Sequence, residues 1–209
     1  GQIVTVAYSG IELALRVDAG GKAQLSVPGF ERSTRATLNF PDGKTLDVDL
    51  PFQDTERLMR VGLAWDLPVS LDLHAIAAGA AVGSEDHVWR GSPGSYREAR
   101  RGGGYLASYR SIDGFGDNLQ VYTHVIPRGG GPEVVKMMID FATRHRAPSD
   151  ETCGTGRFAA PGYRVLRSER GQLERTLNRR LGAIACKDVE TVGTRLIERA
   201  VEDVIVSSR

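Results

Sequence analysis

The stretch Thr37–Leu50, TLNFPDGKTLDVDL, shows most clearly which kind of fold this chain adopts. Its Pro41-Asp42-Gly43-Lys44 segment is a turn signal between two short runs of strand-forming residues. After the turn, Leu46, Val48 and Leu50 alternate with polar residues, so all three face one side of an extended strand. The stretch therefore predicts a β-hairpin.

The rest of the chain repeats this pattern of short strands bounded by turn residues, of which it has 25 Gly and 9 Pro. Further strands are expected around Ser9-Gly10 and at Ala23–Pro28, Leu119–Ile126, Val134–Ala142 and Ala200–Val206. The segment Gln172–Leu181 fits either a helix or one arm of a long hairpin. Because no apolar stripe with helical spacing is sustained, the sequence predicts an all-β fold, a β-sandwich or jelly-roll-like arrangement.

Three regions are expected within the 209 residues. Residues 1–55 form a small Ig-like β unit, too small for a large core of its own, which should pack against the region after it. Residues 56–148 form the main sandwich, and a polar stretch at 144–149 marks its end. Residues 149–209 form a C-terminal segment packed on the sandwich.

The charge balance excludes some partners. Lys and Arg number 27 against 26 Asp and Glu, a formal net charge of +1 that creates no field for recruiting nucleic acid. No apolar run approaches the roughly 18 residues that a transmembrane helix needs. Gly1–Val6 lacks the pattern of a signal peptide, so we expect a soluble chain from which any such peptide has been removed.

The two cysteines, Cys153 and Cys186, lie in the C-terminal third. Their spacing fits neither a CxxC redox pair nor a zinc knuckle, and we expect them to form one disulfide. Closing a loop of this length would stabilise the fold by roughly 3 to 4 kcal/mol. The alternative is two buried free thiols in a cytosolic protein.

The most distinctive motif is the run Trp65–His74, WDLPVSLDLH, followed by Gly103-Gly104-Tyr105-Leu106 and by Asp113–Asn118, DGFGDN. If a strand runs through Leu71, Leu73 and Ala75, these apolar residues lie on one face of it, and Ser70, Asp72 and His74 lie on the other.

These motifs resemble the YfaP-like exported bacterial β-sandwich domains, which carry a tryptophan strand, a DLDLHV strand and a later DG-x-G turn. The resemblance covers about residues 58 to 142, with Ser70 where the family has Asp. A more distant similarity is to pre-peptidase C-terminal domains. The resemblance implies a periplasmic or secreted accessory module with no established catalysis.

A rival resemblance is to the TerD calcium-binding proteins, on Val61–Asp66 and Gly116–Leu119, although the second acidic cluster of that family is missing. Calcium takes six to eight oxygen ligands from loops. The carboxylates expected to supply them are Asp66, Asp72, Asp113 and Asp117. The alternative is that these residues cap turns.

A basic and aromatic surface is the expected ligand or partner patch, with the alternative of a solvated loop. Its members are His74, Trp89, Arg90, Tyr96, Arg100, Arg101 and Tyr105. His74, His87 and His124, without HxH or HxxxH spacing, are a weaker candidate zinc set for a metal-assisted hydrolase. No serine elbow or nucleotide phosphate loop is present.

The sequence therefore predicts a non-catalytic module that binds a protein partner or a cell-envelope glycan, with no cofactor or with structural calcium. The alternatives are the hydrolase and a TerD-like calcium-binding stress protein.

Overall fold

The computed structural model describes residues 1–65, 71–100, 103–129, 132–141, 157–158, 162–180, 184–185, 197–198 and 201–207. Nearly every regular element in these ranges is a β-strand; the helical elements among them are the 3₁₀ turn η1 (Thr55–Arg57) and the short helix α1 (Tyr96–Ala99). Within the same ranges, no helix is long and apolar enough to cross a membrane. The all-β, sandwich-like fold expected from the sequence is confirmed.

The first four strands form an antiparallel sheet, called here the N-terminal sheet, with strand order β2-β1-β3-β4. Its strands are β1 (Ile3–Tyr8), β2 (Ile11–Arg16), β3 (Ser33–Asn39) and β4 (Thr45–Pro51). The hairpin expected at Asp42-Gly43 joins β3 to β4, and the turn expected at Ser9-Gly10 joins β1 to β2. Both predictions are confirmed.

The central sheet has five antiparallel strands in the order β13-β12-β5-β9-β8. They are β5 (Leu58–Trp65), β8 (Gly104–Tyr109), β9 (Asn118–Val125), β12 (Gly162–Glu169) and β13 (Gln172–Arg180). The hairpin alternative for Gln172–Leu181 is the correct one, because β13 pairs along its length with β12.

The outer sheet has the order β15-β10-β6-β7, with β16 also paired to β10. Its strands are β6 (Leu71–Ala77), β7 (His87–Val88), β10 (Glu133–Phe141), β15 (Ile197–Glu198) and β16 (Val204–Val206). β16 is the closing strand expected near the end of the chain. A separate small pair joins β11 (Arg157–Phe158) to β14 (Ile184–Ala185).

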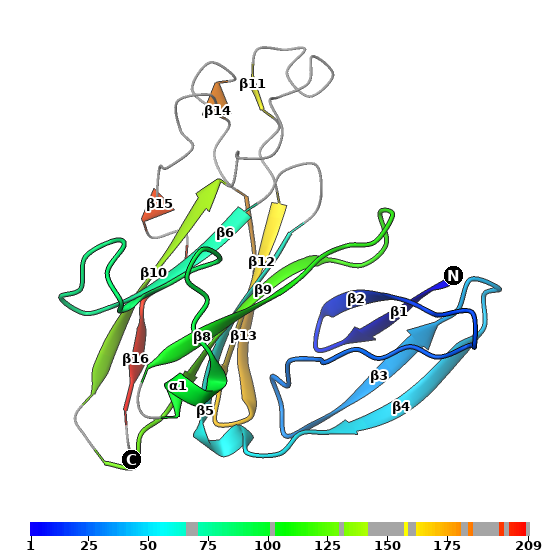
Figure 1. Ribbon diagram of the computed structural model, residues 1–209, viewed down its shortest axis with the longest axis horizontal. Coiled ribbons are helices and arrows are strands. Elements are labelled where there is room, and N and C mark those ends of the chain that lie inside the picture. Colours follow the sequence, from blue (N-terminus) through cyan, green and yellow to red (C-terminus); the bar gives the residue numbers. More distant parts are fainter. Residues whose placement is uncertain are drawn as a thin grey trace.

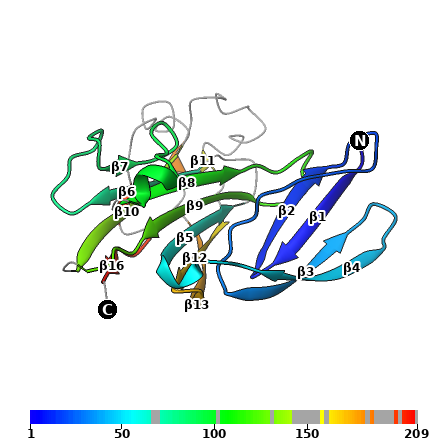
Figure 2. The same cartoon turned by 60° about the horizontal axis from the view of Figure 1, so that its bottom comes forward.

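The central sheet is covered on both faces. One face shares an apolar core with the inner face of the outer sheet, with residues from β5, β6, β10 and β16. The other face shares a second core with the N-terminal sheet. Figures 1 and 2 show the N-terminal sheet beside the two larger sheets, with the tip of the β8–β9 hairpin reaching toward it.

Strand β5 explains why its sheet can pack on both sides. Its large side chains, such as Met59 and Leu63, face the core shared with the outer sheet. Gly62 faces the other way, where Phe30 packs so closely that a Cβ at position 62 would lie 2.8 Å from the Phe30 ring. From Val61 to Trp65 the strand therefore alternates large and small residues rather than apolar and polar ones.

The strand expected at Ala23–Pro28 is wrong. These residues pair with no strand of the described chain, although Leu25 and Val27 pack against the core beneath the N-terminal sheet. An alternating sequence buries its apolar side chains here without a hydrogen-bonded ladder. The division at residues 55 and 148 stays a prediction, and the polar boundary at 144–149 lies outside the described residues.

Candidate functional site

Asp72 and His74 lie on the face of β6 that points away from the apolar core, as the strand alternation predicts. Leu71 and Leu73 belong to the core, whereas Asp72 and His74 do not. Both polar side chains are nonetheless buried, with 3% and 4% of their surfaces exposed. Ser70, the third residue expected on this face, lies outside the described residues.

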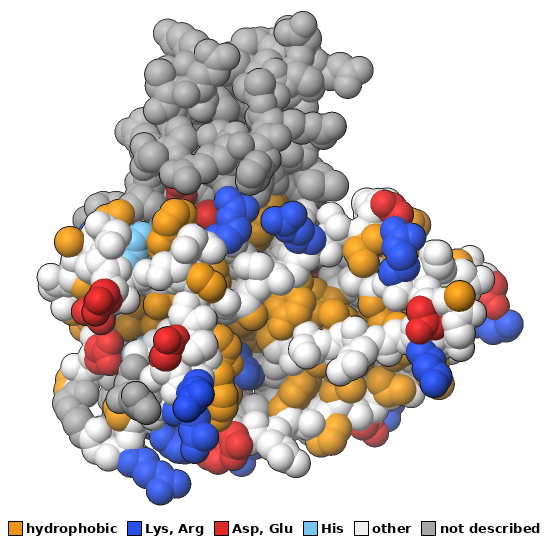
Figure 3. Space-filling view, in the orientation of Figure 1, with side chains coloured by type: hydrophobic (Ala, Val, Ile, Leu, Met, Phe, Trp, Pro, Cys, Tyr) orange, Lys and Arg blue, Asp and Glu red, His pale blue; other side chains and the backbone are white. Residues whose placement is uncertain are grey.

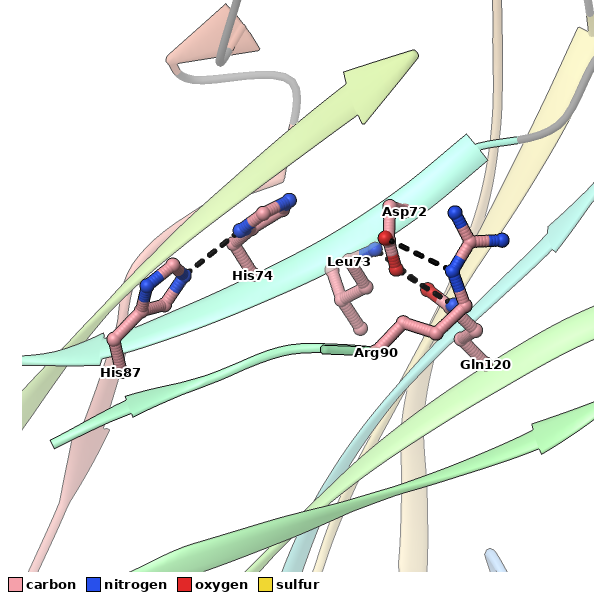
Figure 4. Close-up of polar contacts among 6 residues, drawn as sticks. All are labelled: Asp72, Leu73, His74, His87, Arg90 and Gln120. Carbon is pink, nitrogen blue, oxygen red and sulfur yellow. Dashed lines mark hydrogen bonds and ion pairs between the residues drawn. The ribbon is translucent and has the colours of Figure 1, made fainter. Parts of the chain in front are cut away.

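The Asp72 carboxylate is held by two long side chains (Figure 4). The Gln120 amide nitrogen donates to its Oδ1 at 2.8 Å, and Arg90 Nε lies 3.3 Å from its Oδ2. The same Gln120 side chain accepts a hydrogen bond from the Leu73 backbone N–H. The structure thus joins two sequence-predicted residues, the buried Asp72 and the partly exposed Arg90, in one ion pair.

His74 and His87 form a hydrogen-bonded pair, also drawn in Figure 4. His74 Nδ1 lies 2.8 Å from His87 Nε2, and the Gly83 N–H donates to His87 Nδ1 at 2.8 Å. Because His87 Nδ1 accepts this bond, a neutral His87 carries its proton on Nε2 and donates it to His74 Nδ1. Trp89 stacks on both rings, with centroid distances of 5.4 and 5.7 Å.

The positions of the protons on His74 and His87 argue against these two histidines as zinc ligands. Both Nδ1 lone pairs already accept hydrogen bonds, and both Nε2 atoms then carry protons, so the pair offers no lone pair to a metal in this arrangement. Burial lowers the pKa of His74 to about 4, helped by His87 and Arg90, and burial also lowers the pKa of His87. The structure places the third histidine, His124, beside Tyr122 and Glu133 instead.

The structure does not gather the expected calcium ligands into one cluster. Asp113 is exposed and pairs with Arg16 at 2.7 Å. Asp117 is buried, accepts a hydrogen bond from the Glu12 N–H at 2.8 Å and forms an ion pair with Arg164. Among the described residues no group of three or more His, Cys, Asp or Glu could hold a metal ion. Asp66 lies outside them.

The expected ligand patch is divided between two places. His74, Trp89 and Arg90 lie around the outer face of β6, whereas Tyr96 is 47% exposed and contacts Tyr105 edge-on at a centroid distance of 5.9 Å. Arg100 is exposed at the end of α1. Arg101, Cys153 and Cys186 lie outside the described residues.

An acidic cleft opens between β7 and β8, the edge strands of the two facing sheets. Its volume is about 410 Å³. Four carboxylates line it, one pair from the loop before β7, one from α1 and one from the start of β10: Glu85, Asp86, Glu98 and Glu133. Tyr122 lines it as well, and no Lys or Arg of the described chain does. Figure 3 shows acidic side chains on the β7 side of the molecule and basic ones over α1.

His124 lies behind the inner end of this acidic cleft and is fully buried. Its Nδ1 lies 3.0 Å from the Tyr122 hydroxyl, which donates to it when the imidazole carries its proton on Nε2. The His124 Nε2 has no hydrogen-bond partner among the described residues and lies 3.5 Å from Glu133 Oε2. Burial lowers the pKa of His124, although the Glu133 carboxylate opposes this shift.

Sequence reasoning missed the acidic cleft, because its carboxylates are spread from residue 85 to residue 133. One local signal was present, the Ser-x-x-Glu spacing of a helix start: Ser95 Oγ accepts a hydrogen bond from the Glu98 N–H at 3.3 Å and donates to Glu98 Oε2 at 2.6 Å. That motif predicts the start of α1 and so the position of one cleft carboxylate.

Comparisons with family models, curated proteins and solved structures found no match to this chain. The YfaP-like, pre-peptidase C-terminal and TerD resemblances therefore stay predictions.

Proposed function

We propose that this chain is a non-catalytic binding module whose acidic cleft receives a lysine or arginine side chain of a protein partner. The observation that carries the proposal is the set of four carboxylates around one concave site whose described lining includes no Lys or Arg. A cationic group entering the cleft would find an attractive field on several sides.

The spacing of the carboxylates favours an organic cation over a metal ion. A metal ion needs ligands within about 2.6 Å of one point, and no described group of acidic or histidine side chains meets that requirement. A guanidinium or ammonium group on a long side chain can instead reach carboxylates along the cleft.

The inner end of the acidic cleft supports the same proposal. Glu133 stands between solvent and the buried His124, whose Nε2 makes no hydrogen bond to a described residue. A guest ammonium paired with Glu133 would complete a polar chain that already runs from the Tyr122 hydroxyl through the His124 ring. Partly buried pairs of this kind are screened less by salt than surface pairs.

Basic and aromatic side chains beside the acidic cleft would add to its selectivity for a partner. The helix α1 carries Arg97 and Arg100, both exposed, next to the exposed Tyr96. A partner segment with a basic residue for the cleft and an acidic residue beside it would match both charges. Tyr96 and Arg100, two residues of the ligand patch expected from the sequence, would thus contact the partner beside the acidic cleft.

The test uses fluorescein-labelled hexalysine and hexaglutamate, with affinities measured by fluorescence anisotropy at low and physiological salt. The double variant Glu85→Gln/Asp86→Asn should weaken hexalysine binding about tenfold, the equivalent of about 1.4 kcal/mol. The matched control, Asp47→Asn/Asp49→Asn on β4, removes the same charge from a distant surface and should bind as the parent chain does. Equal effects of both variants, or equal binding of hexaglutamate, would overturn the proposal.

Export and calcium remain parts of the proposal that rest on the sequence. Alkylation of the unreduced chain followed by intact-mass measurement should find no free thiol at Cys153 or Cys186, and two alkylated thiols would support the cytosolic alternative. A thermal melt in EDTA, repeated with added calcium, tests the expected site at Asp66, Asp72, Asp113 and Asp117; an unchanged midpoint would leave these carboxylates with structural roles.

A further inference from the structure

A second concave surface lies at the other end of the molecule from the acidic cleft. It is a groove of about 660 Å³ between the solvent side of the N-terminal sheet and the turn that joins β8 to β9. We call it the sheet groove. The lining residues that matter here are Thr5, Glu12, Asn39, Phe40, Asp113 and Phe115.

The Phe115 side chain is held out into solvent by a rigid turn. It is 54% exposed, although large apolar side chains are usually buried. Two backbone hydrogen bonds of 2.9 Å join Phe115 to Ile112 across the turn. Next to it, Gly116 has φ +73° and lies so close to β2 that a Cβ there would be 2.6 Å from the Ala14 nitrogen.

The turn is also tied to β2 by Asp117. Its carboxylate accepts a hydrogen bond from the Glu12 N–H, and its own N–H donates to the Glu12 carbonyl at 2.6 Å. These bonds occupy the backbone groups of Glu12, and Gly116 packs against the Ala14 nitrogen, so the turn covers this part of the β2 edge and an added peptide strand cannot pair there. The occupant of the sheet groove must be recognised through side chains.

The side chains offer two aromatic rings with polar groups nearby. Phe40 and Phe115 both line the sheet groove, and the described residues include no ring contact between them. The Glu12 carboxylate makes no hydrogen bond or ion pair with any described residue. Asn39 donates to Thr5 Oγ1 at 3.2 Å, which leaves its amide oxygen as an acceptor.

We infer that the sheet groove binds a neutral oligosaccharide. The C–H face of a sugar ring packs on an aromatic side chain, while its hydroxyl groups donate to carboxylate and amide oxygens. The sheet groove supplies both kinds of contact, and the basic side chain in its described lining, Arg16, is already paired with Asp113 at 2.7 Å. An anionic glycan would meet Glu12 and Asp113, so a neutral one fits better.

The experiment titrates the full chain with three hexasaccharides, chitohexaose, cellohexaose and maltohexaose, and follows binding by isothermal titration calorimetry. At least one probe should give a saturable isotherm. Phe115→Ala should weaken that binding at least tenfold, whereas Phe115→Tyr, which keeps an aromatic ring, should bind as the parent chain does. Because the ring is exposed, neither change opens a core. Glu12→Gln should weaken it by a smaller factor.

Two controls separate this inference from the proposed function. Tyr96→Ala removes a similarly exposed ring at the rim of the acidic cleft and should leave saccharide binding unchanged, and Phe115→Ala should leave hexalysine binding unchanged. Circular dichroism melts confirm that each variant is folded. The inference is overturned if none of the three hexasaccharides binds, or if Phe115→Ala and Tyr96→Ala bind equally well.

Discussion

The two faces of the central sheet are packed in different ways. Against the outer sheet, the contact is a broad apolar core in which whole strands such as β5, β6 and β10 take part. Against the N-terminal sheet, the core is accompanied by specific bonds around one side chain, Phe30. Ser168 Oγ donates to the Phe30 carbonyl, and Arg60 donates to the neighbouring Gly29 carbonyl. Both contacts thus combine an apolar core with a few polar bonds, which go to Gly29 and Phe30 on the N-terminal side and run from Gln120 to β6 on the other.

The strongest test of this difference is Phe30→Ala. Phe30 is fully buried over Gly62, and the loss of such a ring costs about 3 to 5 kcal/mol. We expect the free energy of unfolding to fall by that amount and amide exchange to accelerate mainly in β1 to β4. Leu63→Ala, which opens the core on the opposite face, should accelerate exchange in both sheets that share that core; identical exchange patterns in the two variants would contradict the comparison.

The histidines whose pKa values are lowered lie in the outer and central sheets. The four histidines all lie after residue 73, and the His74–His87 pair joins β6 to β7. The pKa of buried His74 falls from its usual 6.5 to about 4. Between these values the unfolded chain binds the proton and the folded chain does not, so stability is lost as the pH falls from 6.5 towards 4, by up to about 3 kcal/mol.

Urea unfolding at pH 7.5, 5.5 and 4.5, followed by tryptophan fluorescence, measures this loss. His74→Gln removes the titrating group and should show a shallower decline of stability with acid. Parallel declines for the parent chain and the variant would show that other groups carry the pH dependence.

The smallest expected loss of stability concerns two carboxylates of the β8–β9 turn, Asp113 and Asp117. Asp117→Asn weakens the buried bonds to Arg164 and to the Glu12 N–H and should cost about 1 to 3 kcal/mol. Asp113→Asn breaks only an exposed pair with Arg16 and should cost less than about 1 kcal/mol. Chemical denaturation measures both, and the reverse order would mean that the turn is not fastened through Asp117.

Much of the fold could be predicted because it depends on local signals. The Asp42-Gly43 turn, the paired strands around Ser9-Gly10 and the split of β6 into two faces all follow from residues close in the chain. Ala23–Pro28 shows the limit: its alternation is real, but none of the described strands pairs with it. Alternation reports which side chains are buried and does not report the hydrogen-bonded partner.

The sites were harder to predict than the strands, because each depends on residues brought together by the fold. Strand alternation places Asp72 on the polar face of β6, but its partner Gln120 comes from the other sheet. Asp113 and Asp117 share one short motif, yet one is exposed and the other buried. The carboxylates of the acidic cleft carry almost no local signal, and only the packing of α1 and β10 in the folded chain brings Glu98 and Glu133 to the same cleft.

The side chain of Gln120 also satisfies a backbone donor at the margin of β6. β7 pairs only with Ala75 and Ile76, so within the described chain the first half of β6 has no neighbouring strand on that side. The Gln120 amide oxygen accepts the Leu73 N–H there, as the backbone of a neighbouring strand would. A second molecule that approached this margin would find this donor already satisfied, so one carboxamide makes intermolecular strand pairing at Leu73 less favourable.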